Sequence, residues 1–423
     1  MTNTPTDRNE YSECDTVVIG AGQAGLSISY FLKKQLNDHV ILERYRIGSK
    51  WHNRWDSFTL VTPNVMNNLP DYPSPGHPNE YLKRDVVINY LESFAQIFEP
   101  PLRLGLTATS VKPNPPEESF FVETTDGSYH CQNVVIATGT FQQPYIPACS
   151  SGLPSEIIQL HSDQYRNPSQ LPDGSILVVG SGQSGAQIAD ELHEAGKKIY
   201  LSVSGAVRIP RRYRGRDIME WLKLAGIFER TIEQLESPSE RFNPNPHISG
   251  KNGGKTINIR RFGRDGMMLT GKVKNIQNGS IQFANDLNHN LDKADSFAGQ
   301  LCQNIDHLIE KLDIPAPPAQ DSELAFDTWI PPQINHLQLK EAGISSVIWA
   351  TGYRYDYSFV MADVFDQDGY PIQQKGVTSY PGLYFVGMHW LHKQKSGLLY
   401  GVSEDAQNIA EHILKRNKKR QSN

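Results

Sequence analysis

The sequence predicts an α/β protein of two Rossmann-like dinucleotide-binding domains, each with a three-layer ββα/βαβ arrangement, the second inserted in the first. Two observations carry this prediction. Residues 17–19 form an apolar, β-branched run that leads directly into a G-x-G-x-x-G motif at residues 20–25. Residues 176–179 lead into a second complete copy at residues 180–185. Each copy is typical of a buried parallel strand, a tight turn and the start of a helix.

The first glycine motif is expected to hold the pyrophosphate of a dinucleotide. Gly20 permits the turn, Gly22 lets the backbone approach the pyrophosphate, and Gly25 lets the helix pack against the strand. The helix then starts at Gln23 and Ala24, where unpaired N–H groups and the positive end of the helix dipole would face the phosphates.

A second strand, residues 40–43, ends in Glu43, which lies 23 residues after Gly20. A carboxylate at this position is placed to accept hydrogen bonds from both ribose hydroxyls of an adenosine. The alternative, an acid on the surface at the end of a strand, is disfavoured because the glycines are in register. Arg44, Lys50 and Trp51 follow. Basic and aromatic residues beside a phosphate loop suit a flavin nucleotide more than a nicotinamide, although Trp51 alone could belong to the core.

The second motif lacks the matching acid. Counting 23 residues from Gly180 reaches Val203, and arginines follow soon after. A missing carboxylate with nearby arginines favours a 2′-phosphate, and hence NADPH over NADH. A solvated basic loop is the alternative, and spacing does not decide which arginine contacts the phosphate. The residues expected at this second site are Gly180, Gly182, Gln183, Ser184, Gly185, Ser202, Arg208, Arg211 and Arg212. Thr351, in a later turn, is also expected to bind a cofactor.

Two apolar strands end in A-T-G, at Ala137-Thr138-Gly139 and at residues 350–352. The first turn is expected to close the first nucleotide domain and to lead back toward its cofactor. The second is expected to return the chain to that domain. Residues 1–150 and 346–423 therefore form the predicted FAD-binding domain, and residues 151–345 form the predicted NADPH-binding domain.

Hydrophobic periodicity predicts further elements. Residues 85–98, 217–233 and 292–312 have helical spacing, whereas residues 237–254 are polar and contain Pro and Gly, which indicates an exposed loop. A last strand at residues 383–387 precedes a final helix, whose dipole could point at the flavin ring.

Composition limits the class of protein. The chain has 423 residues, 38% of them hydrophobic and 21% charged, with a net charge of −5. This favours a two-domain cytoplasmic enzyme without nucleic-acid or membrane partners, since no apolar run is long enough to span a bilayer. None of the four cysteines forms C-x-x-C or has metal-ligand spacing, which excludes dithiol chemistry and predicts no metal site.

The order of these parts resembles the flavin-containing monooxygenase-like, two-dinucleotide-binding flavoproteins over nearly the whole chain. The stretches 54–64, 161–168, 211–222 and 383–405 are most similar to a bacterial flavin-dependent oxidoreductase group often encoded beside a nitrilase. The resemblance implies FAD on the first motif and NADPH on the second. It also implies that the flavin is lined by Lys50, Trp51, the main chain of Ala108, Gly387 and Leu398.

The chain departs from the family pattern at two places. The fingerprint F-x-G-x-x-x-H-x-x-x-[YW] survives only as His161 and Tyr165, with Ser155 and Ile157 where Phe and Gly are expected. Val61 stands where the flavin-containing monooxygenases have an Asn that helps to hold the oxygenated flavin. Valine cannot donate a hydrogen bond, which weighs against oxygenation, although the auxin-making plant branch also lacks this Asn.

The expected function is that of an NADPH-dependent FAD monooxygenase, which uses O2 and a C4a-(hydro)peroxyflavin on a small organic substrate. A flavin oxidoreductase without oxygenation and a flavin-dependent redox sensor are the alternatives. The catalytic residues stay unassigned. The candidates near the flavin are Val61, His389 and His392, and a structural role is open for each histidine. The identity of the substrate and a homodimeric state are also left open.

Overall fold

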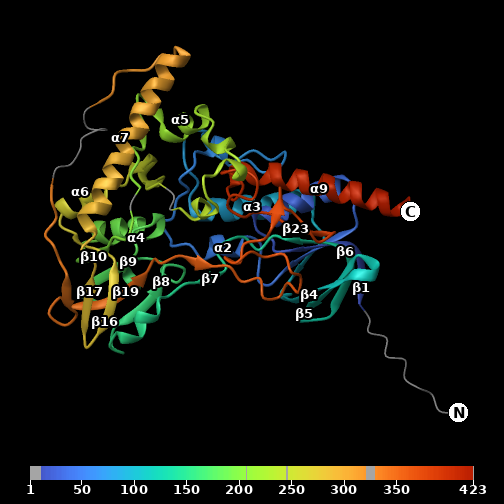
Figure 1. Ribbon diagram of the computed structural model, residues 1–423, viewed down its shortest axis with the longest axis horizontal. Coiled ribbons are helices and arrows are strands. Elements are labelled where there is room, and N and C mark those ends of the chain that lie inside the picture. The colour runs from blue at the N-terminus through green and yellow to red at the C-terminus, as the bar shows by residue number, and fades with distance from the viewer. Residues whose placement is uncertain (1–10, 206, 244–245, 321–328, 423) are drawn as a thin grey trace.

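The computed structural model describes residues 11–422 except 206, 244–245 and 321–328. Figure 1 shows two α/β bodies side by side, each built on its own sheet, with the C-terminal helix α9 lying over one of them. The predicted α/β fold with two Rossmann-like domains is confirmed.

The first sheet has the strand order β21-β22-β23-β6-β1-β2-β3, and β4 and β5 continue antiparallel from β6. Its centre, from β23 to β3, is parallel. The strands are β1 (Ser12–Ile19), β2 (His39–Glu43), β3 (Leu102–Leu104), β4 (Ala108–Asn114), β5 (Ser119–Thr124), β6 (Ser128–Ile136), β21 (Gln373–Gln374), β22 (Val377–Thr378) and β23 (Leu383–Phe385).

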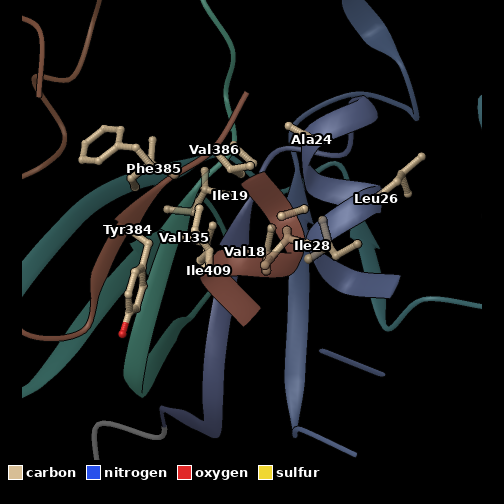
Figure 2. Close-up of a cluster of buried hydrophobic side chains, with 14 of the residues drawn as sticks. Val18, Ile19, Ala24, Leu26, Ile28, Val135, Tyr384, Phe385, Val386 and Ile409 are labelled. Carbon is tan, nitrogen blue, oxygen red and sulfur yellow. The ribbon is translucent and has the colours of Figure 1, made fainter. Parts of the chain in front are cut away.

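Helices α1 (Gln23–Lys34) and α9 (Leu399–Gln421) pack against this sheet. Figure 2 shows how their apolar side chains meet those of β1, β6 and β23. Val18, Val135 and Ile409 are completely buried there, which explains why the first strand carries no polar residue where it enters the glycine turn. Helices α2 (Ser49–His52) and α3 (Arg84–Phe98) complete this body.

The second sheet has five parallel strands in the order β15-β10-β9-β19-β8. They are β8 (Ile158–His161), β9 (Ser175–Val179), β10 (Ile199–Ser202), β15 (Met268–Thr270) and β19 (Ile344–Trp349). Its helices are α4 (Gln183–Glu194), α6 (Ile259–Arg264) and α7 (Leu287–Leu312). Strand β19 lies between β9 and β8, so the second domain extends past residue 346, where the sequence boundary was placed.

The chain enters and leaves the second body through paired segments. Strand β7 (Gln143–Pro144) pairs antiparallel with β20 (Tyr353–Arg354), which follows the second A-T-G turn. Return to the first sheet therefore begins at β20. The remaining small strands are β11 (Arg212–Tyr213), β12 (Arg216–Asp217), β13 (Ile248–Ser249), β14 (Lys255–Thr256), β16 (Val273–Gln277), β17 (Ser280–Phe283) and β18 (His336–Gln338).

Two expected segments differ from the structure. The helix predicted at residues 217–233 is the short α5 (Ile218–Leu224) followed by 3₁₀ turns, because Gly226 adopts φ 72° and ends the helix. The exposed loop predicted at residues 237–254 instead contributes β13, whose Ile248 is 1% exposed.

Candidate dinucleotide-binding sites and the space between them

In the first glycine turn, Gly20 and Gly25 have no room for a side chain, whereas Gly22 faces open space. Gly20 has φ 111°, and a Cβ atom on it would lie 2.7 Å from the carbonyl oxygen of Ala137. A Cβ atom on Gly25 would overlap the Gly20 carbonyl oxygen. A Cβ atom on Gly22 would meet no protein atom within 4 Å. This open position caps α1 without a side-chain hydrogen bond, so its first N–H groups stay available to a phosphate.

Glu43 closes the side of this turn. Its Oε2 accepts a hydrogen bond from Ala21 N at 2.9 Å, and its Oε1 accepts from Tyr45 N at 3.0 Å. The carboxylate is therefore fixed at the end of β2, directly beside the glycine turn. Leu106 N donates to the Glu43 carbonyl at 3.2 Å, which brings the start of β4, at Ala108, near the same place. Arg44 is exposed at this end of β2.

The starts of α1 and α9 meet beyond the turn. Trp51 Nε1 donates to Gln23 Oε1 at 3.0 Å, and Gln23 Nε2 donates to the Gly397 carbonyl at 3.4 Å. Gly387 has φ 80°, and a Cβ atom on it would lie 2.5 Å from that of Ala24. Leu398 caps α9 without a side-chain hydrogen bond. Most of the residues expected to bind FAD thus converge on one edge of the first sheet.

The second turn repeats this geometry. Gly180 has φ 102°, and a Cβ atom on it would lie 2.5 Å from the carbonyl oxygen of Ala350. A Cβ atom on Gly185 would overlap the Gly180 carbonyl oxygen, and Gly182 is open. Both A-T-G turns therefore have the same structural role, since each presses an alanine carbonyl against the first glycine of its motif.

An equivalent backbone hydrogen bond in each site shows which residues correspond. Gly20 N donates to Leu42 O at 2.8 Å, and Gly180 N donates to Ser202 O at 3.1 Å. The residue after Leu42 is Glu43, so its counterpart is Val203, which is completely buried. The hydroxyl of Ser202 is occupied because it donates to the Gly271 carbonyl at 2.9 Å. The second site therefore has no carboxylate where the first has Glu43.

The three candidate arginines lie in different surroundings. Arg208 stands six residues after the end of β10, and its Nε lies 3.0 Å from Asp295 Oδ1. Its backbone pairs with that of His247 beside the second glycine turn. Arg212 is exposed, and its Nη2 donates to the Gly253 carbonyl at 2.7 Å.

Arg211 is a structural residue. Its Nη2 lies 2.6 Å from Asp217 Oδ2, its guanidinium lies 4.2 Å from the centre of the Tyr81 ring, and its Nη1 donates to the Val61 carbonyl at 2.7 Å. It is 2% exposed and joins the two bodies. The side chain of Val61 packs into an apolar cluster with Met66 and is not a hydrogen-bond donor.

The two candidate histidines face different neighbours. His389 is half-buried, and its ring meets that of Phe141 edge-on with centroids 6.1 Å apart. Burial lowers the pKa of His389, which favours the neutral imidazole. His392 is buried against α9, with Nδ1 3.9 Å from Asp405 Oδ1. Burial lowers the pKa of His392 and raises the pKa of Asp405 to about 6.

His161 and Tyr165, the two residues that match the fingerprint, both contact other parts of the protein. His161 Nε2 lies 2.9 Å from the Gly352 carbonyl, and Tyr165 donates to Glu191 Oε2 at 3.0 Å. Thr351 donates to the Tyr145 carbonyl, whereas Thr138 Oγ1 accepts from the side chain of Gln142 at 2.9 Å.

A hairpin of β13 and β14 covers the start of α4, which sequence reasoning missed. The side chain of Gln183 bonds to the Ile248 carbonyl, and Gln187 Nε2 donates to the same oxygen at 3.3 Å. Gly250 packs so closely on the Leu60 carbonyl that a Cβ atom there would overlap it. The only sequence signals were Ile248 and the glycine, set in an otherwise polar stretch.

A polar and aromatic cluster lies between the two sites, and sequence reasoning did not assemble it. The Arg54 guanidinium lies 4.5 Å from the centre of the Phe141 ring, and Tyr353 donates to Asp163 Oδ1 at 2.9 Å. Lys50 Nζ lies 4.0 Å from Asp163 Oδ2. Phe141 and Tyr353 lie within two residues of the ends of the two A-T-G turns, which is the signal that could have predicted this cluster.

The described part of the chain has no metal site, disulfide or membrane-spanning helix. Those residues contain no group of three or more side chains that could hold a metal ion. The four cysteines, all of which are described, form no disulfide. None of the described helices has the length and apolarity needed to cross a membrane.

The chain thus has two glycine turns, one beside an acidic residue, Glu43, and one beside an apolar residue, Val203. Such a pair of turns is typical of an oxidoreductase that binds two dinucleotides. The family model of the pyridine nucleotide-disulphide oxidoreductases matches residues 17–234. An uncharacterised CzcO-like oxidoreductase of Geobacillus kaustophilus is 35% identical over 95% of this chain and 98% of its own. The chain belongs to the pyridine nucleotide-disulphide oxidoreductase family.

The wider resemblance is to flavin monooxygenases. A flavin-containing monooxygenase of Stenotrophomonas maltophilia matches the fold with a TM-score of 0.65 at 20% identity, covering 95% of this chain and 98% of that one. A probable indole-3-pyruvate monooxygenase of Arabidopsis thaliana, YUCCA3, is 26% identical over 95% of this chain and 86% of its own. The predicted resemblance to this flavoprotein group is confirmed, whereas the neighbouring nitrilase gene stays a prediction.

Proposed function

We propose that this chain is an NADPH-dependent FAD monooxygenase that acts with O2 on a small organic substrate. The observation that carries the proposal is the pair of matching glycine turns, of which one faces the carboxylate of Glu43 and the other has the apolar Val203 at the equivalent position. The first suits the free ribose hydroxyls of FAD, and the second suits a phosphorylated ribose. The monooxygenase part is supported by the similarity to the probable indole-3-pyruvate monooxygenase YUCCA3, which matches 95% of this chain.

The residues around each turn fit the cofactor proposed for it. The α1 start at Gly22 would hold the FAD pyrophosphate, and Glu43 would accept from the adenosine ribose. The α4 start at Gly182 would hold the NADPH pyrophosphate. Arg208 is the arginine best placed for the 2′-phosphate, because it lies beside the second glycine turn and its partner Asp295 is also paired with Arg260. Arg211 is held by Asp217, by the Tyr81 ring and by the Val61 carbonyl.

Bound FAD would pass two electrons from NADPH to O2, so that one oxygen atom enters the substrate and the other leaves as water. The chain's own contribution is to hold both cofactors and to exclude water. The loop at residues 387–398 covers the start of α1, and the β13–β14 hairpin covers the start of α4. Phe141 and His389 present aromatic surface between them.

The test is oxygen incorporation. FAD-loaded protein is given NADPH, isotope-labelled O2 and a panel of amines, nitriles, ketones and oxo acids, and the products are analysed by mass. One labelled oxygen atom per NADPH in a product is expected. If every NADPH consumed yields hydrogen peroxide across the panel, the monooxygenase proposal is wrong.

A second candidate, a flavin oxidoreductase without oxygenation, is favoured by Val61. Its side chain is apolar and packed in an apolar cluster, so it offers no side-chain donor to an oxygenated flavin. This function predicts NADPH oxidation by an organic electron acceptor under anaerobic conditions, at a rate that O2 does not exceed.

A further inference from the structure

We propose that Arg54 forms an anion subsite between the two dinucleotide sites and binds a carboxylate group of the substrate. The inference rests on the proposed function and adds the substrate class, which is a small organic acid with an apolar or aromatic body. No residue so far assigned to either cofactor supplies this contact.

Arg54 lies where strand ends from both sheets converge. It comes shortly after α2, and its guanidinium lies 4.5 Å from the centre of the Phe141 ring and 5.5 Å from that of Phe58. The Phe141 ring meets Tyr353 edge-on at 5.1 Å and His389 at 6.1 Å. These rings follow β6, β19 and β23, and the carboxyl ends of parallel strands are where ligands bind in such folds.

The guanidinium has no partner of opposite charge in the described chain. Among residues 11–205, 207–243, 246–320 and 329–422, Arg54 makes no ion pair within 4.0 Å and no side-chain hydrogen bond. The nearby carboxylate of Asp163 accepts from Tyr353 and lies beside Lys50 instead. The cluster thus contains two cations and one anion.

This arrangement leaves the Arg54 guanidinium open to an anionic ligand. Arg54 is partly buried, and this burial lowers the pKa of its guanidinium because it disfavours the charged form. Aromatic faces stabilise a guanidinium from above and leave its five N–H groups, which lie in its plane, free to donate to a ligand. A bound carboxylate would accept two of them in parallel and restore neutrality.

The anion is assigned to the substrate because the cofactors' phosphates already have sites. Each pyrophosphate has an open glycine turn and a free helix start of its own, at Gly22 and at Gly182. Arg54 lies among the rings of Phe58, Phe141 and Tyr353 instead, where an apolar body attached to a carboxylate would be covered.

The test compares two ligands of similar shape, phenylpyruvate and phenylacetone, which differ by a carboxylate in place of a methyl group. Their dissociation constants are measured on the FAD-loaded protein with NADP⁺ present, from the change in flavin absorbance. The unmodified protein is expected to prefer phenylpyruvate. Arg54→Met should weaken phenylpyruvate binding by about 10- to 100-fold, the range for a lost charge-assisted hydrogen bond, with phenylacetone changed little. Arg54→Lys should recover part of the loss.

The matched control is Arg103→Met, an exposed arginine on β3, which should leave the ratio of the two constants unchanged. Flavin content and melting temperature show that each variant is folded. Equal binding of the two ligands by the unmodified protein, or an unchanged ratio in Arg54→Met, overturns the proposal. So does a loss of NADP⁺ affinity in Arg54→Met at an unchanged ratio, because the anion would then be a cofactor phosphate. Since binding is measured without turnover, a failed oxygenation assay leaves this result independent.

Discussion

The two nucleotide sites of this chain share a backbone and differ in one side chain at the end of a strand. Both motifs place their first glycine near φ 100–110° and press it against an A-T-G carbonyl. Both leave the second glycine open. The strand that follows ends in the fixed carboxylate of Glu43 in one site, whereas in the other the buried Val203 comes directly after the strand.

This difference indicates that the residues which form the glycine turn are not the residues expected to select the nucleotide. The glycines meet the steric demands of a strand, turn and helix, which are the same for any dinucleotide. We propose that the choice depends on the residue at or just after the end of the next strand, where the side chain of Glu43 offers two acceptor oxygens and that of Val203 offers none. The sites also have different covers, a loop leading into α9 on the first and the β13–β14 hairpin on the second.

The largest expected effect is on stability, and it distinguishes Gly25, which is packed against the backbone, from Gly22, which is open to a ligand. Gly25→Ala should cost about 3 kcal/mol or more of unfolding free energy, because its methyl group overlaps the Gly20 carbonyl. Gly22→Ala should leave the stability of the flavin-free protein nearly unchanged and still weaken FAD binding. Urea unfolding and FAD titration measure both.

The same pair in the second site, Gly185→Ala and Gly182→Ala, serves as the comparison. Gly182→Ala should impair flavin reduction by NADPH while FAD stays bound. Loss of FAD from Gly182→Ala would contradict the assignment of the two sites.

An intermediate effect is expected from Glu43→Gln. Removing the charge should weaken FAD binding by about 10- to 100-fold, since hydrogen bonds to a charged group contribute about 1.5–3 kcal/mol. NADPH affinity should not change. Glu156→Gln, which changes an exposed acid, is the control, and the measurement is FAD titration by fluorescence quenching. An FAD affinity equal to that of the unmodified protein would show that Glu43 only fixes the turn.

The smallest effect is expected from Arg208→Met. The preference for NADPH over NADH in flavin reduction should fall by about tenfold, in line with an ionic contact of roughly 1–2 kcal/mol that is partly shared with Asp295. Arg260 still neutralises Asp295 in this variant, so the fold should persist. Arg212→Met should keep the preference. A protein that already uses both nucleotides equally would remove the argument from Val203.

Sequence predicted the features that depend on neighbours along the chain. Both glycine turns, the A-T-G turns and the contrast between Glu43 and Val203 follow from short, fixed spacings. What it could not predict depends on partners that are remote in sequence. Strand β19 has the apolar pattern of any buried strand, so its pattern did not tell which sheet it joins.

The same limit applies to the arginines and the hairpin. Arg211 looked like a phosphate ligand until the structure placed it between Asp217 and Tyr81. The polar stretch containing Ile248 reads as exposed from the sequence because the residues that bury Ile248, such as Met66 and Cys302, are remote along the chain. Spacing reports which residues are near one another in the chain, whereas these roles are set by contacts between the two bodies.

The second body is inserted in the chain of the first, and this insertion sets the order in which the two sheets can fold during synthesis. All five strands of its sheet lie between residues 158 and 349, so that sheet can close as soon as residue 349 is free of the ribosome. The Val134–Ile136 edge of β6, by contrast, waits for β23, about 250 residues later. At a synthesis rate of about 5–20 residues per second, the first sheet stays open for roughly 10–50 s while the inserted domain folds beside it.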